Sequence, residues 1–99
     1  MAVMTDPIGI LVERFAQVLI RSGKAPMSAY LEAEDLTVDV LEDMRKVGAD
    51  VGHLLRRIQI YHLRTRGIEP SAICIRLGVN RCYVHKAYKK ELLRRRYAA

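Results

Sequence analysis

The chain contains no tryptophan, one phenylalanine and two cysteines among its 99 residues. Its core must therefore be aliphatic, with a few of its five tyrosines, and two cysteines are too few for a disulfide scaffold. No apolar run reaches the roughly 20 residues that cross a bilayer. No basic segment precedes the first apolar stretch, as it does in a secretory signal peptide. We expect a cytoplasmic protein that does not enter membranes.

Motifs that carry chemistry are also missing. Cys82 and His85 supply at most two ligands, whereas a zinc site needs about four. The serines Ser22, Ser28 and Ser71 lack the glycine elbow of a hydrolase, and no phosphate-binding glycine loop is present. We expect no enzyme activity, no metal and no other cofactor. We also expect no small-molecule site, because the apolar positions are all assigned to helix packing.

Charge is distributed unevenly along the chain. The formal net charge is +6, but residues 1–55 contain five basic and nine acidic side chains, a net charge of −4. From Arg56 onward there are twelve basic and two acidic side chains, a net charge of +10. Such a basic region repels itself unless a partner of opposite sign neutralises it. The basic half therefore predicts a polyanionic partner.

The first predicted helix begins with Asp6 as cap and Pro7 as first residue, and it ends at Arg21. Its apolar side chains cover more than half of the helix circumference, more than one small neighbour buries. Dimerisation explains this excess, and burial within the monomer explains it equally well. The dimerisation candidates are Ile8, Leu11, Val12, Phe15 and Leu19.

The next segment predicts two shorter elements. Residues 22–27 have the Gly and Pro content of a linker, and residues 28–31 form a short helical turn. Asp35 or Thr37 then caps a third helix that ends near Gly48. Acidic side chains lie early in that helix and basic ones late, as the helix macrodipole favours. The alternative is an acidic surface offered to RNA polymerase or another protein.

The basic half predicts three helices. Asp50 caps the first, from Val51 to Arg66, whose apolar side chains on two sides indicate that it is sandwiched between neighbours. Pro70 suits the first position of the second helix, since proline needs no hydrogen-bond acceptor there. A glycine turn separates this short helix from the third, in which Asn80 is the cap.

The turn resembles the helix-turn-helix domains of bacterial and bacteriophage transcription regulators. The small residue Cys74 lies four before Gly78, Val79 follows the glycine, Asn80 caps the next helix, and Val84 lies six after the glycine. The family usually has alanine where this chain has cysteine. Cys74 then occupies a core position while the other cysteine is on the surface, which argues against a disulfide. The alternative is an ordinary helical hairpin.

The C-terminal half also resembles the Mor-type activators of Mu-like phages, in which such a unit likewise follows a basic helix. The glycine-rich strand segment of that family has no counterpart in the N-terminal half. The resemblance to helix-turn-helix domains covers a third to a half of the chain, and it implies binding to the major groove of duplex DNA.

This docking geometry assigns roles to the basic half. The residues expected to read bases are Arg81, Cys82, Tyr83 and Lys86. The residues expected to contact phosphates are Asn80, His85, Lys89, Lys90, Arg56, Arg57, Arg64, Arg66, Arg94, Arg95 and Arg96. We expect residues 91–99 to extend the last helix, with the three consecutive arginines beyond it as a mobile basic arm.

The sequence thus predicts an all-α protein with a helical oligomerisation segment, residues 1–49, and a tri-helical helix-turn-helix domain, residues 50–99. Its expected function is sequence-specific transcription regulation as a homodimer, in a bacterium or bacteriophage. The alternatives are a protein-interaction module on the same scaffold and a nucleic-acid binder without sequence preference. The sequence does not distinguish an activator from a repressor.

Overall fold

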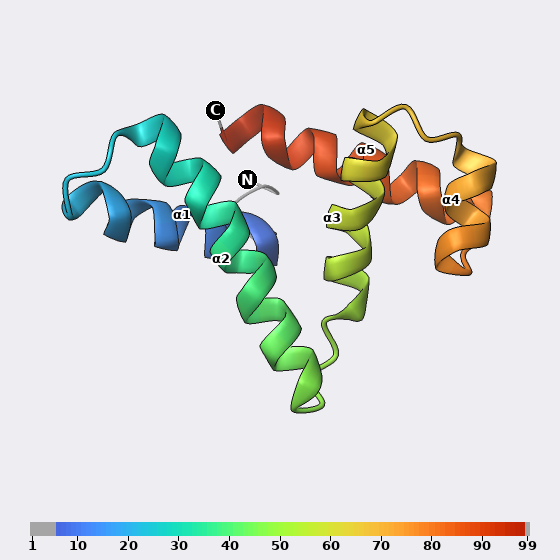
Figure 1. Ribbon diagram of the computed structural model, residues 1–99, viewed down its shortest axis with the longest axis horizontal. Coiled ribbons are helices and arrows are strands. Elements are labelled where there is room, and N and C mark those ends of the chain that lie inside the picture. Colours follow the sequence, from blue (N-terminus) through green and yellow to red (C-terminus); the bar gives the residue numbers. More distant parts are fainter. Residues whose placement is uncertain (1–5, 99) are drawn as a thin grey trace. The chain divides into compact units, whose positions relative to one another are not determined.

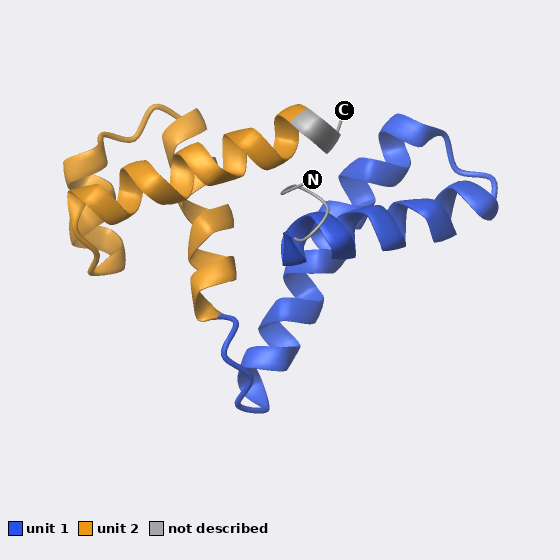
Figure 2. Cartoon of the chain, turned by 180° about the vertical axis from the view of Figure 1, so that it is seen from behind, with its two compact units in different colours: residues 1–51, 98 blue, residues 52–97, 99 orange. Residues whose placement is uncertain are grey.

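The computed structural model describes residues 6–98, which form five α-helices and no strand (Figure 1). The helices are α1 (Pro7–Arg21), α2 (Pro26–Lys46), α3 (Gly52–Thr65), α4 (Pro70–Leu77) and α5 (Arg81–Ala98). The all-α prediction is confirmed. The chain divides into two compact units, one up to Val51 and one from Gly52 to Tyr97 (Figure 2). Among the described helices, none is both long and apolar enough to traverse a bilayer.

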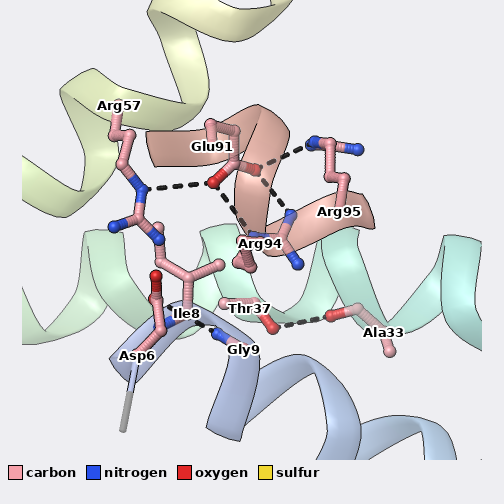
Figure 3. A network of polar contacts seen from close by, with 9 residues as sticks. All are labelled: Asp6, Ile8, Gly9, Ala33, Thr37, Arg57, Glu91, Arg94 and Arg95. Carbon is pink, nitrogen blue, oxygen red and sulfur yellow. Dashed lines mark hydrogen bonds and ion pairs between the residues drawn. The ribbon is translucent and has the colours of Figure 1, made fainter. Parts of the chain in front are cut away.

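Helix α1 begins and ends as predicted. The Asp6 carboxylate accepts hydrogen bonds from the backbone N–H groups of Ile8 at 3.0 Å and Gly9 at 3.5 Å (Figure 3). Pro7 occupies the first helical position, where a missing N–H costs nothing. The helix ends at Arg21, and Gly23 follows with a positive φ of 104°. Local capping chemistry therefore determines both ends of α1.

Helix α2 shortens the predicted linker to residues 22–25 and replaces the two predicted shorter elements with one helix. It begins at Pro26 and continues without a break to Lys46. Thr37, which we expected to cap a new helix, is fully buried in the helix interior. Its hydroxyl donates to the carbonyl oxygen of Ala33 at 2.8 Å, four residues earlier (Figure 3). This bond satisfies the threonine inside the helix, so no break is needed.

The first unit is a helical hairpin in which α1 and α2 pack together. Each helix buries a stripe of residues spaced by four: Ile8, Val12 and Ala16 on α1, and Ala29, Ala33, Thr37 and Leu41 on α2. Alanine has almost no side chain, so the alanines of both stripes permit close approach of the two helices. The buried stripe of α2 thus runs from Ala29 to Leu41, across the point at which a helix break was predicted.

Two of the proposed dimerisation residues are already buried within the monomer. Ile8 and Val12 are buried within the chain, so they cannot contact a second subunit, while Leu11, Phe15 and Leu19 are half-buried. The exposed apolar residues of the unit are Ile10, Val18, Met27, Leu31, Met44 and Val47. Burial in the monomer therefore accounts for one side of α1.

A polar contact also joins the two helices of the hairpin. The Tyr30 hydroxyl lies 2.9 and 2.8 Å from the two carboxylate oxygens of Glu13 and donates to that carboxylate. This hydrogen bond, followed by burial, raises the pKa of Tyr30 above its ordinary value of 10.0. Because the folded pKa is raised, the stabilisation is present below pH 10.0 and is lost as the pH rises through the folded pKa.

Helix α3 differs from the predicted 51–66 helix by one residue at each end. It buries five apolar side chains: Leu54, Leu55, Ile58, Ile60 and Leu63. Apolar residues on two sides of α3 are buried, as the sequence indicated. Ile60 and Leu63 face α4 and α5, where they form the core of the second unit.

Candidate nucleic-acid interface

The turn between α4 and α5 has the predicted geometry. Gly78 ends α4 in the left-handed region, with φ 67° and ψ 36°, and its N–H donates to the carbonyl oxygen of Cys74 at 2.9 Å. The N–H of Val79 donates to the same oxygen at 3.1 Å. At the start of α5, the Asn80 Oδ1 accepts the Tyr83 backbone N–H at 2.8 Å. A glycine stop and an asparagine cap therefore set the angle at which α5 leaves the turn.

Gly78→Ala is expected to lower the free energy of unfolding by about 1 kcal/mol. The left-handed conformation is strained for a residue with a Cβ, and this strain exceeds the stabilisation that alanine gives by reducing the entropy of the unfolded chain. Apart from its chain neighbours, no atom of the described residues lies within 4 Å of a Cβ at this position, so the backbone conformation determines the cost. The control is Gly52→Ala, which is equally unobstructed but lies at a helical position without a positive φ. Urea unfolding should show the control unchanged or stabilised; equal losses in both variants would contradict the assignment.

The core of the second unit anchors α5 beside this turn. Ile60, Leu63, Ile73 and Val84 are buried together, and each of the three helices contributes to the cluster. Half-buried side chains surround them: Ile68, Cys74, Leu77, Val79, Tyr83, Ala87 and Tyr88. Val84 lies in the first turn of α5, so the beginning of this helix is held by its apolar side.

The opposite side of α5 carries a row of exposed side chains, which we call the basic face of α5. It consists of Arg81, Cys82, His85, Lys86, Lys89 and Arg96. Their spacings of three, four and seven place them on one side of an α-helix. Leu92 and Leu93 interrupt the row, with 42% and 47% of their surfaces exposed.

Other predicted site residues lie elsewhere in the second unit. Tyr83 is half-buried against the core, while Lys90 is exposed at the edge of the basic face. Arg56 and Arg66 are exposed on α3 and just after it. Arg64 is half-buried, with its guanidinium 5.2 Å from the centre of the Tyr88 ring. Arg64 thus packs on an aromatic ring of α5.

A buried carboxylate gathers three of the arginines. Glu91 is fully buried, and its Oε1 accepts the Nε–H groups of Arg57 at 3.1 Å and Arg94 at 3.0 Å (Figure 3). Its Oε2 accepts from Arg94 Nη2 at 2.5 Å and from Arg95 Nε at 3.0 Å. Arg57 belongs to α3 and the others to α5, so the cluster ties these two helices together. We call these four residues the Glu91 cluster.

The Glu91 cluster corrects the assignment of Arg57 and Arg94 to phosphate contacts. Only 4% and 3% of their surfaces are exposed, and both guanidinium groups donate to the buried carboxylate. Arg95 also bonds to Glu91, and its guanidinium lies 3.7 Å from the centre of the Tyr61 ring. Arg57 and Arg94 are thus too buried to contact a phosphate, and Arg95 is half-buried.

The predicted mobile arm is also wrong. Helix α5 continues through Ala98, so the three consecutive arginines lie inside it and only Arg96 remains exposed. The buried bonds of the two preceding arginines to Glu91 hold the end of the helix in place. Salt bridges at spacings of three and four stabilise a helix locally.

Glu91 is the residue that the sequence reasoning missed. Its position continues the buried stripe that runs through Val84, Ala87 and Tyr88, at spacings of three and four. A lone acidic residue on that stripe, within a region of twelve basic residues, is the signal that would have identified it. Buried carboxylates need such partners.

The two cysteines are free, with Cys74 half-buried and Cys82 exposed, as predicted. Within the part of the chain that the structure describes, His, Cys, Asp and Glu side chains form no group of three suited to a metal ion. No protein-family model, curated protein or solved structure matches this chain. Its function is therefore inferred from its own residues.

Proposed function

We propose that the protein is a sequence-specific, double-stranded DNA-binding transcription regulator whose α4 and α5 act as a helix-turn-helix. The observation that carries the proposal is the orientation of the first turns of α5. Val84 is buried while Arg81, Cys82 and Lys86 are exposed beside the Gly78 turn. An α-helix with its first turns exposed in this way fits the major groove.

The side chains of the basic face suit the groups that duplex DNA presents. Arg81 has the fork geometry that donates two hydrogen bonds to guanine O6 and N7. Cys82 and the edge of Tyr83 suit a thymine methyl group, and Lys86 suits a base acceptor. The cations expected to neutralise phosphates are Lys89, Lys90, Arg56, Arg66 and Arg96, with the His85 ring and the Asn80 amide donating beside them.

The proposed regulator is a homodimer that reads two half-sites, since one short helix recognises few base pairs. The candidates for the subunit contact are the exposed apolar side chains of the first unit, including Val18, Met27 and Leu31. They replace Ile8 and Val12, which are buried. The exposed acidic side chains of α2 are a candidate contact for RNA polymerase. These are Asp35, Asp39, Glu42 and Asp43.

Selection of bound sites from a random duplex library tests the proposal. It should be performed at roughly 150–200 mM salt, where non-specific phosphate binding is weak. We expect enrichment of an inverted repeat with half-sites about 10 base pairs apart, one helical turn. The double variant Arg81→Ala, Lys86→Ala should select nothing, whereas Lys46→Gln, a charge loss on the first unit, should select the same repeat.

Absence of enrichment by a folded protein would refute sequence-specific regulation. If the protein then still bound every duplex with steep salt dependence, the basic face would be a general nucleic-acid surface. If it bound no duplex, an acidic protein would become the partner. Enrichment of a single half-site would keep sequence reading and refute the dimer.

A further inference from the structure

A hollow of about 250 Å³ opens between the beginning of α3 and the middle of α5. The described lining residues belong to the second unit. They are His53, Leu54, Arg57, Tyr83, Lys86, Ala87 and Lys90. The sequence predicts no small-molecule site, because it assigns Leu54 and Ala87 to helix packing. In the structure both residues also line this hollow.

The walls of the hollow suit the carbon skeleton of a small ligand. Leu54 and Ala87 are apolar, and Tyr83 contributes an aromatic ring that is half-buried against the core. Lysine side chains add aliphatic stems whose charged ends reach solvent. The volume lies just below the range of about 300–1,000 Å³ for ligand sites, which favours a compound about the size of one aromatic ring.

The charge of the lining selects an anion. Lys86 and Lys90 are both exposed and four residues apart on α5, so their ammonium groups extend from one side of the helix. Among the described residues that line the hollow, none carries a carboxylate. The nearest acid along the helix is Glu91, whose two oxygens already accept four hydrogen bonds from arginines. His53 supplies a further ring donor at the edge.

We propose that this hollow binds a small aromatic anion, a ring bearing a phosphate or carboxylate, and that the bound anion displaces DNA. The ring lies against Leu54, Ala87 and Tyr83, and its charged group lies between Lys86 and Lys90. The displacement rests on the proposed function, because Tyr83 and Lys86 are assigned there to base reading. One occupant excludes the other, which makes DNA binding responsive to a metabolite of this class.

Phenyl phosphate is the probe for binding, titrated into ¹⁵N-labelled protein at constant ionic strength. We expect saturable shifts of the amide signals of residues 53–57 and 83–90, and little effect from phenol or inorganic phosphate at equal concentration. Lys90→Gln should weaken binding about three- to tenfold, as loss of one exposed charge-assisted contact does. Arg76→Gln is the matched control in the same unit, since Arg76 is exposed on α4 and does not line the hollow.

Equal shifts with inorganic phosphate would show a general anion surface and overturn the ring site. Equal shifts with phenol would overturn the charge selection. Unchanged affinity in Lys90→Gln, or an equal loss in Arg76→Gln, would overturn the assignment to this hollow.

Competition with a labelled duplex tests the second part. Phenyl phosphate should release the duplex at the concentration that saturates the amide shifts, and inorganic phosphate should not. Binding of both ligands without competition would overturn the regulation alone. Duplex binding without phenyl phosphate binding would overturn the hollow as a site and leave the proposed function intact, whereas the reverse result would refute the proposed function and leave the site.

Discussion

Glu91→Ala is expected to lower the free energy of unfolding by roughly 3–5 kcal/mol, the usual cost of removing one partner from a buried ion pair. The substitution removes the acceptor of four hydrogen bonds from Arg57, Arg94 and Arg95. Two of these guanidinium groups are at least 96% buried, so water replaces the lost carboxylate poorly. Urea unfolding followed by circular dichroism measures the loss.

The control is Glu69→Ala, which removes the other acidic residue of the second unit. Glu69 is exposed and its side chain makes no capping hydrogen bond, so its loss should cost less than about 0.5 kcal/mol. A double-mutant cycle of Glu91→Ala with Arg94→Ala isolates the pairwise term, because a residue pair in contact shows a coupling energy of about 0.5–3 kcal/mol. A loss in Glu91→Ala as small as that of the control, or zero coupling, would contradict the Glu91 cluster.

Local signals in the sequence predicted those helix ends that depend on one or two residues. The Asp6 cap with Pro7, and the Gly78 stop with the Asn80 cap, all occur as expected, because each is decided by a side chain or a glycine within a few positions. Helix α2 differs because packing decides it. Asp35 and Thr37 are good caps in isolation, but Thr37 lies in the stripe that α2 buries against α1, and this packing keeps the helix continuous through the exposed Asp35.

In the candidate site, too, some features follow from local sequence and others from tertiary contacts. Helical spacing alone identified the exposed positions Arg81, Cys82 and Lys86. Arg57 is buried and bonds to Glu91, which is 34 residues later in the chain. A count of basic residues therefore overestimates the cations available to a phosphate backbone. Whether an arginine faces solvent is a property of the fold.

Substitutions along the basic face of α5 should separate into two classes once an operator has been selected. Arg81→Ala is expected to weaken operator binding by about 1–3 kcal/mol, roughly 5- to 150-fold, and to leave binding to unrelated duplex almost unchanged. Lys89→Gln should weaken binding to both duplexes similarly, because a phosphate contact carries no sequence information. Fluorescence anisotropy with both duplexes measures the two affinities.

The salt dependence of the same variants provides the decisive comparison. Each neutralised phosphate contributes about 0.9 to the slope of log affinity against log salt concentration, so Lys89→Gln should reduce that slope by about 1. Lys46→Gln removes the same charge from the first unit, where Lys46 is exposed at the end of α2, and should leave the slope unchanged. If both lysine variants changed the slope equally, net charge alone would govern binding. If Arg81→Ala weakened operator and unrelated duplex alike, α5 would not read sequence, because the arginine would then act only as one more phosphate contact.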